Sequence, residues 1–310
     1  MELTDGRQDG GWRAIWRAQA LAHPLAGAGL LLAVALLAVL FVSSVARLAA
    51  GSAGPALLLA TAGGLAGFAA TAVGALPALV LRRLSTRTED TLLGLAAGMM
   101  LAASAFSLIL PGIAAGAELA GSRPLGALFV VAGLALGALL MLGLDDFMPH
   151  EHLHLGPHGA GSERVSRVWL FVFAIVLHNL PEGMAIGVAF SRADLTVGLP
   201  LTSAIAIQDV PEGLAIAMAL KAVGLSAVRA VAIAAGSGVM EPLGALFGAG
   251  LGGGLAAAYP IGLGLAAGAM IFVVSHEVIP ETHRNGHQTP ATLGLLAGFA
   301  LMTVLDTTLG

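Results

Sequence analysis

The sequence has no cysteine, and only 10% of its residues are charged and 5% aromatic. Without cysteine the chain can form no disulfide, thiolate zinc site or cysteine-held iron–sulfur cluster, so nitrogen, oxygen or methionine sulfur must supply any metal ligands. A soluble domain carries about 25% charged residues, so the low charge argues against a water-exposed surface over most of the chain. No basic patch points to a nucleic acid partner.

Apolar residues and glycine take the place of the missing charge. Hydrophobic residues make up 57% of the 310 positions, the mean hydropathy is +0.92, and 43 residues are glycine. Such a chain is expected to use the lipid bilayer as its main solvent. Because small residues let helix backbones approach where lipid gives no hydrophobic drive between helices, the glycines predict closely packed transmembrane helices.

Nine apolar runs are long enough to cross a bilayer, which takes about 20 helical residues. The first, residues 25–49, follows a polar N-terminal tail over residues 1–24 and is too long for a signal-peptide core. The other eight cover residues 56–81, 91–115, 124–144, 168–191, 197–222, 228–252, 257–279 and 290–308. The sequence therefore predicts an all-α, polytopic transmembrane helix bundle.

The placement of Lys and Arg predicts the orientation in the membrane. With nine spans, eleven basic residues fall on one side: Arg7, Arg13, Arg17, Arg82, Arg83, Arg87, Arg164, Arg167, Lys221, Arg229 and Arg284. The other side has three: Arg47, Arg123 and Arg192. Because basic residues gather in cytoplasmic loops, we expect a cytoplasmic N-terminus and a C-terminus on the opposite side of the membrane.

A histidine-rich loop, at about residues 146–167, falls on the predicted cytoplasmic side. It contains Glu151 and four histidines, His150, His152, His154 and His158. This composition is typical of a flexible segment that collects metal weakly. The alternative is a solvated loop that happens to be rich in histidine.

Two neighbouring spans repeat one polar motif. Residues 178–183 read His-Asn-Leu-Pro-Glu-Gly, and residues 208–213 read Gln-Asp-Val-Pro-Glu-Gly. Because neighbouring spans run antiparallel, the two motifs are expected to face each other at similar depth, as at the midplane sites of many transporters. Residues four apart share a helix face, which joins His178 to Glu182 and Gln208 to Glu212. Asn179 and Asp209 lie one position further round.

A third apolar run adds a further acidic residue, Glu241, which stands beside Pro242. The motif prolines, Pro181 and Pro211, cannot donate a helix hydrogen bond and free backbone carbonyls one turn earlier. Several carboxylates close together in low dielectric repel one another, and a divalent cation relieves that repulsion. An imidazole with carboxylate and amide oxygens suits Zn²⁺, with Cd²⁺, Fe²⁺ and Mn²⁺ as alternatives.

Two other readings of these polar residues stay open. Carboxylate and histidine chains also serve as proton relays, so a proton-coupled carrier of another solute is the main alternative function. Alternatively, His178 and Glu182 form only hydrogen bonds between helices. The recurrence of acids in three neighbouring helices favours a functional role over the second reading.

The sequence His276-Glu277 near the end of a later span begins like a metalloprotease H-E-x-x-H helix. Pro280 stands where the second histidine is required, which disfavours an intramembrane protease, and we expect no enzyme activity. His276 and Glu277 are then either a metal relay on the exit side or an ordinary polar helix end.

Met99 and Met100 lie within an apolar run, where methionine usually fills gaps in the core. Met100 as a soft metal ligand is the less favoured reading. Asp145, Asp146 and Asp306 lie near span ends, where solvated caps are expected and ligands at an entrance or exit are the alternative.

At the paired motifs, with the histidine-rich loop before them, the chain resembles the ZIP family of zinc and iron transporters, and its bacterial members in particular. The resemblance covers about residues 56–310, which leaves the span over residues 25–49 as an addition to an eight-helix core. It implies a multi-pass protein of the bacterial inner membrane with a periplasmic C-terminus. It also implies import of metal into the cytoplasm, with Zn²⁺ as the transported ion and Cd²⁺ as a surrogate.

The resemblance further implies how the site residues are shared between two metals. Around a first metal it suggests Met100, His178, Glu182, Gln208 and Glu212. Around a second it suggests Asn179, Asp209 and Glu241, with Glu182 and Glu212 bridging. It also implies a homodimer in which a four-helix transport unit slides against a scaffold. Many animal members carry histidine at the positions of Gln208 and Glu212, so the site here is poorer in nitrogen.

Overall fold

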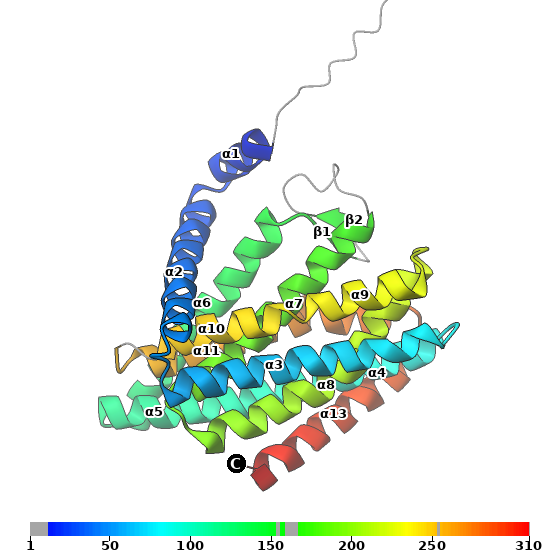
Figure 1. Ribbon diagram of the computed structural model, residues 1–310. Helices are drawn as coiled ribbons and strands as arrows, with labels where there is room; N and C mark the ends of the chain where they lie inside the picture. The colour runs from blue at the N-terminus through cyan, green and yellow to red at the C-terminus, as the bar shows by residue number, and fades with distance from the viewer. Residues whose placement is uncertain (1–11, 153–155, 159–166, 253–254, 310) are drawn as a thin grey trace, which may run out of the picture.

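The computed structural model describes residues 12–152, 156–158, 167–252 and 255–309, and these form a bundle of helices (Figure 1). The N-terminal half has α1 (Trp12–Ala22), α2 (Pro24–Ala49), α3 (Pro55–Ala75), the 3₁₀ turn η1 (Leu76–Leu79), α4 (Thr86–Ala103), the π-helix η2 (Ser104–Ile109), α5 (Leu110–Ala120) and α6 (Arg123–Phe147). After the strands β1 (His150–His152) and β2 (Gly156–His158) come α7 (Arg167–Phe190), α8 (Leu195–Ala222), α9 (Ala227–Ser237), α10 (Met240–Gly252), α11 (Ala258–Val273), the π-helix η4 (Val274–Val278), α12 (Ile279–His283) and α13 (Gln288–Leu309). The predicted all-α polytopic fold is confirmed.

Eight helical segments in the described part of the chain are long and apolar enough to cross a membrane. They run over Pro24–Ala49, Pro55–Leu79, Thr86–Ala120, Arg123–Phe147, Leu195–Ala222, Ala227–Leu251, Ala258–His283 and Gln288–Leu309. The remaining predicted span, residues 168–191, coincides with α7, a helix of 24 residues, which is also enough to cross the hydrocarbon. Each of the nine predicted spans thus has a helical counterpart.

Three spans contain an interruption that the sequence reading missed. The predicted span over residues 228–252 breaks between α9 and α10, at Gly238 and Val239, because Pro242 cannot donate a hydrogen bond to the carbonyl of Gly238. The π-helices η2 and η4 each end two residues before a proline, Pro111 or Pro280. A π turn widens the helix where a proline ring would clash with the preceding turn. Such turns occur often at functional sites.

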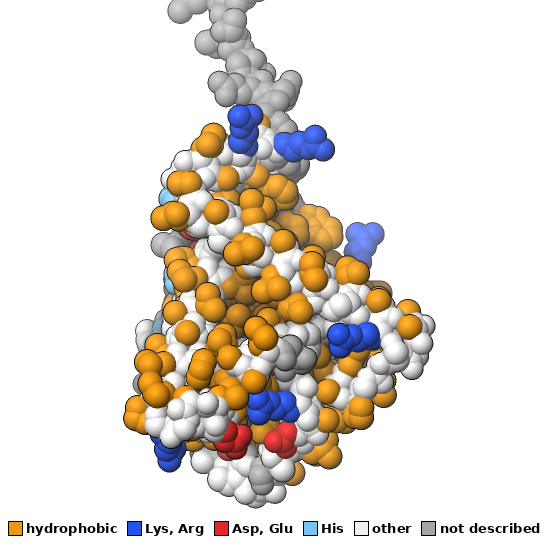
Figure 2. Space-filling model, turned by 90° about the vertical axis from the view of Figure 1, so that its left-hand side faces the viewer, with side chains coloured by type: hydrophobic (Ala, Val, Ile, Leu, Met, Phe, Trp, Pro, Cys, Tyr) orange, Lys and Arg blue, Asp and Glu red, His pale blue; other side chains and the backbone are white. Residues whose placement is uncertain are grey.

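The outer surface of the bundle is apolar. Figure 2 shows hydrophobic side chains spread over the face turned to the viewer, with few charged groups between them. Large residues that would normally be buried are exposed on several helices, among them Leu25 (89%), Leu32 (73%) and Leu128 (60%). An apolar surface of this extent is expected of a protein that faces lipid. The chain is therefore a multi-pass membrane protein.

Glycines bring the helices of the bundle into close contact, as their abundance predicted. In three helix pairs, α4 with α13, α6 with α11 and α7 with α10, an added Cβ would collide with the partner backbone. The glycines involved are Gly94, Gly98, Gly294 and Gly298 in the first pair, Gly133, Gly137, Gly264 and Gly268 in the second, and Gly183, Gly187, Gly244 and Gly248 in the third. They recur every four residues, the spacing that lines one helix face.

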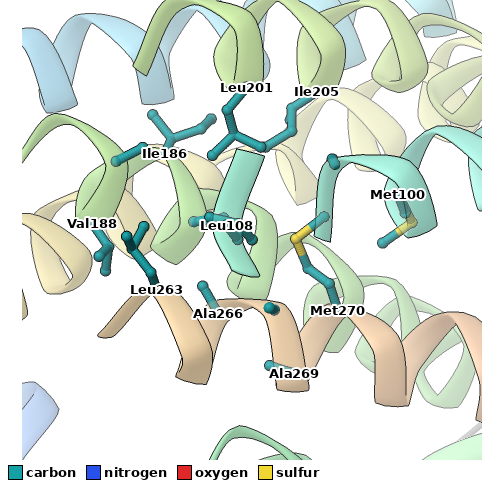
Figure 3. Packing of buried hydrophobic residues seen from close by; sticks show 14 of the residues in the cluster. Met100, Leu108, Ile186, Val188, Leu201, Ile205, Leu263, Ala266, Ala269 and Met270 are labelled. Atoms are coloured by element: carbon teal, nitrogen blue, oxygen red, sulfur yellow. The ribbon is translucent and has the colours of Figure 1, made fainter. Parts of the chain in front are cut away.

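An apolar core lies where these pairs meet. Figure 3 shows Leu108, Ile186, Leu201 and Met270 packed together from η2, α7, α8 and α11. These side chains are at most 2% exposed. The core fixes the motif helices α7 and α8 against the rest of the bundle.

The N-terminal span α2 lies along the outside of the bundle (Figure 1). Ser44 donates a hydrogen bond of 3.0 Å from Oγ to the carbonyl of Leu246 in α10. The rings of Phe41 and Phe247 are 5.2 Å apart between the same two helices. Helix α2 is thus docked on α10.

The histidine-rich segment includes a short hairpin where the sequence reading expected a loop. Strands β1 and β2 pair antiparallel, with His150 opposite His158 and His152 opposite Gly156. His154 lies outside the described residues. The side chains of the remaining histidines are likewise not described, so their proposed metal-collecting role stays a prediction.

Candidate metal centre

The two motif helices bring three carboxylates together. One oxygen each from Glu182 of α7 and from Asp209 and Glu212 of α8 lie within 4.8 Å of one another. Glu182 and Asp209 are 1% and 2% exposed, whereas Glu212 is half-buried. The predicted face-to-face placement of the motifs is therefore confirmed. Carboxylate oxygens at this separation are close enough to share one cation.

Gln208 joins the two motifs directly. Its side-chain amide donates a hydrogen bond to Oε1 of Glu182. The other Glu182 oxygen, Oε2, has no hydrogen-bond partner, and neither does Oε1 of Gln208. Buried polar atoms are nearly always satisfied, so each such oxygen needs an explanation. Two acceptors without donors, on neighbouring residues, fit a site that receives a cation.

Glu241 contributes a fourth buried acid from the first turn of α10. Its Oε1 accepts a hydrogen bond of 2.7 Å from Oγ1 of Thr71, and its Oε2 has no partner. A Cβ placed on Gly67 would collide with Oε2 of Glu241 and lie 3.3 Å from Oδ2 of Asp209, which also has no partner. The carboxylates of Glu241 and Asp209 therefore lie beside each other.

The first two residues of the α7 motif, His178 and Asn179, differ in exposure. Asn179 is 2% exposed and lies three residues before Glu182 in α7. His178 is partly exposed, and its Nε2 lies 3.4 Å from Oε2 of Glu277. The imidazole also interacts with the charge of Glu212. His178 thus connects the buried acids to the π-helix η4.

Met100 is buried in the apolar core, 2% exposed (Figure 3). Its backbone carbonyl accepts a hydrogen bond of 2.8 Å from Oγ of Ser104. These contacts fit the gap-filling reading of methionine. Its assignment as a soft ligand stays a prediction.

The acids at span ends are less solvated than expected. Asp145 is 6% exposed, and its Oδ2 lies 4.0 Å from Nε2 of His276, which is itself exposed. Asp306 accepts a hydrogen bond of 2.7 Å from Ser107 in η2. The expectation of solvated caps is therefore wrong for Asp145, because α6 and α11 pack against each other and bury that helix end. His276 and Asp145 form a second polar pair near Glu277.

Basic side chains do not neutralise these acids. Among the described residues, no Lys or Arg forms an ion pair with the four acids of the site, Glu182, Asp209, Glu212 and Glu241. Gln208 and Thr71 supply one hydrogen bond each to the set. If these groups only formed hydrogen bonds with one another, a proton shared by Asp209 and Glu241 would join those two carboxylates, but Oε2 of Glu182 would still have no partner.

Thr71 and Gly67 are site residues that the sequence reading missed. Both lie in α3, which reads as an ordinary apolar span apart from its hydroxyls. A buried threonine is common in transmembrane helices, where it usually bonds its own backbone. The sequence alone does not distinguish Thr71, because its role depends on Glu241 lying opposite it in α10.

A multi-pass helix bundle with acids gathered at its centre is the architecture of an ion transporter. Comparison with known proteins agrees with this class. The model of the ZIP zinc transporter family matches residues 149–306, and the chain belongs to that family. ZIP proteins are transporters, so the chain is a transporter and not an enzyme.

Three relatives show how far the similarity extends. The chain is 63% identical to the zinc transporter ZIPB of Bordetella bronchiseptica over 96% of both chains. It is 44% identical to the zinc transporter GufA of Myxococcus xanthus, over 78% of this chain and 95% of that protein. It is 30% identical to the zinc transporter ZIP11 of Bos taurus, over 77% of this chain and 94% of that protein.

Proposed function

We propose that this protein carries zinc across a bacterial inner membrane into the cytoplasm through the carboxylate site between α7 and α8. The observation that carries the proposal is the meeting of one carboxylate oxygen each from Glu182, Asp209 and Glu212 within 4.8 Å of one another. Uncompensated carboxylates in low dielectric repel one another, and a divalent cation offsets that cost. The names of the three relatives, all zinc transporters, support zinc as the ion.

The donor set supports two neighbouring metal positions. The first is formed by His178, Glu182, Gln208 and Glu212, with Met100 as an additional sulfur ligand. The second is formed by Asn179, Asp209 and Glu241, with Glu182 and Glu212 bridging the two. The buried oxygens of Glu182, Asp209 and Glu241 that have no hydrogen-bond donor support this division, because each is free to bind an ion.

The chemistry of the ligands sets the range of ions. One imidazole and an excess of oxygen suit zinc, and they also admit Cd²⁺, Fe²⁺ and Mn²⁺. No thiolate is present to favour softer metals. We therefore propose modest selectivity, with zinc and cadmium transported best.

The path of release follows the polar groups beyond the site. From His178 the ion passes to Glu277, its partner at 3.4 Å, and then to the pair of His276 and Asp145, which begins at the neighbouring residue of η4. The histidine-rich segment then receives it. With the N-terminus in the cytoplasm and the C-terminus in the periplasm, this chain leads inward. We further propose a homodimer in which a four-helix transport unit slides against a scaffold.

Influx of Zn²⁺ and Cd²⁺ into liposomes that hold the purified protein tests the proposal. The control is the variant with His178→Ala and Glu182→Ala, compared at equal protein incorporation. Flux that is lost in the variant is the expected result. Equal flux in both would refute the site, and a pH-dependent flux without metal would favour the proton-coupled carrier.

A further inference from the structure

The hydrogen bond between Thr71 and Glu241 fixes one carboxylate of the site. The Thr71 Oγ1 lies 2.7 Å from Glu241 Oε1 and 3.3 Å from the carbonyl of Gly67. A hydroxyl has a single proton, and the shorter contact directs it to the carboxylate. Both side chains are at most 2% exposed, so water does not compete for this bond.

Thr71 differs in this respect from another threonine of the same helix. Thr61 donates from Oγ1 to the carbonyl of Leu57, one turn earlier, at 2.7 Å. That is the usual arrangement for a hydroxyl inside a transmembrane helix. Thr71 instead directs its proton across to α10. Because Thr71 donates to Glu241 of α10, its hydroxyl acts on a residue of the site and not only on its own helix.

The glycines that end the two paired motifs hold Thr71 and Glu241 in place. A Cβ on Gly183 would collide with the backbone of Glu241, and a Cβ on Gly213 would collide with the carbonyl of Thr71. Helix α7 therefore touches the backbone of Glu241, and helix α8 touches the backbone of Thr71. Small residues allow this close approach, and the distance between the two partners is set by main-chain packing.

The other face of the carboxylate is directed toward Asp209. Gly67, one turn before Thr71, leaves room for Oε2 of Glu241, which an added Cβ would displace. Oε2 has no donor of its own, and neither has Oδ2 of Asp209. With Oε1 bonded to Thr71, Glu241 keeps Oε2 beside Asp209.

We propose that Thr71 is a positioning residue that orients Glu241 toward Asp209 and so sets the affinity of the second metal position. This inference rests on the proposed function of the site. Thr71 does not bind the ion. It restricts the rotamers of Glu241, so that less ordering is needed when the ion binds.

Equilibrium zinc binding to the purified protein tests the inference, with the variants Thr71→Val, Thr71→Ser and Thr61→Val. Valine keeps the branched shape of threonine and removes the proton donor. A hydrogen bond to a charged group stabilises by an amount equivalent to roughly a tenfold or larger change in affinity. We expect Thr71→Val to weaken the second zinc equivalent by about that factor, while Thr71→Ser and Thr61→Val bind like the parent.

A double-variant comparison separates positioning from folding. If Thr71 acts through Glu241, Thr71→Val should have no further effect on zinc binding in a Glu241→Ala background. An equal loss in both backgrounds, or unchanged binding in Thr71→Val, would overturn the inference. A parent that binds only one zinc would also overturn it.

Zinc flux in liposomes keeps the two proposals apart. If the parent shows no zinc flux but Thr71→Val still weakens zinc binding, only the transport proposal is refuted. If the parent transports zinc but Thr71→Val binds zinc like the parent, only the positioning role of Thr71 is refuted.

Discussion

Nε2 of His178 lies 3.4 Å from Oε2 of Glu277, although the two residues come from different spans, α7 and the π-helix η4. The pair extends the cluster of buried acids toward the end of the bundle that carries His276. We therefore predict that Glu277→Gln slows zinc influx by about tenfold, the effect of losing one charged contact, while zinc still binds at the buried acids. Initial influx rates and equilibrium binding, measured on the same preparation, check this.

Glu281→Gln is the matched control for that variant. Glu281 lies one turn further along and pairs with Arg284 at 3.5 Å on the partly exposed helix end, where ion pairs contribute little. Its influx should equal that of the parent. If Glu277→Gln also transports at the parent rate, the proposed release path is wrong.

Gln208→Glu should make the empty site less stable and the zinc-bound site more stable. The change replaces the donor to Glu182 with a further carboxylate, which adds repulsion in low dielectric. We expect a lower melting temperature without metal and a larger rise on addition of zinc than in the parent. Thermal unfolding with and without zinc measures both.

Gln288→Glu provides the comparison, because Gln288 is exposed at the start of α13. An acid there should change the melting temperature little in either condition. A zinc-induced rise no larger in Gln208→Glu than in the parent would argue that Gln208 is remote from the ion.

Asp90 anchors the connection between α12 and α13 to the start of α4. Its two oxygens accept from Asn285 Nδ2 at 3.0 Å and contact His287 Nδ1 at 2.8 Å, and it is 1% exposed. Asp90→Asn should lower the free energy of unfolding by roughly 1–3 kcal/mol, because it leaves buried polar groups poorly matched. Thermal unfolding checks this against Asp194→Asn, a substitution between two good helix N-caps. Equal melting temperatures for the two variants would contradict the anchoring role.

The histidine-rich segment should assist release without being required for it. Replacing His150, His152, His154 and His158 together with serine should reduce zinc influx only in part, because a weak collecting tract is not the transport site. Influx into liposomes measures the remainder. Complete loss of influx would show a larger role for these residues.

The sequence was sufficient to predict the spans and the meeting of the two motifs. Hydrophobic runs of membrane-spanning length and the glycine content have one physical reading each. The repeated motif on neighbouring antiparallel spans predicts facing acids, and Glu182 and Asp209 do face each other.

Contacts between spans that are far apart in the sequence could not be predicted from the pattern of each helix alone. Nothing in the sequence around Glu277 predicts that it lies against His178, because the contact depends on the π turn of η4 and the packing of α7. The partnership of Thr71 with Glu241 depends in the same way on glycines that set the spacing between helices. The break between α9 and α10 at Gly238 was not predicted, because residues 228–252 form one continuous apolar run despite Pro242.

Locating the bound ion is the most direct test of the central claim, that the carboxylates of α7 and α8 hold the transported zinc. Crystals of the protein grown with zinc would give an anomalous difference map at the zinc absorption edge. We predict a peak within coordination distance, about 2.0–2.2 Å, of carboxylate oxygens of Glu182 and Glu212. Peaks confined to the histidine-rich segment or the surface, with none at these carboxylates, would contradict the account.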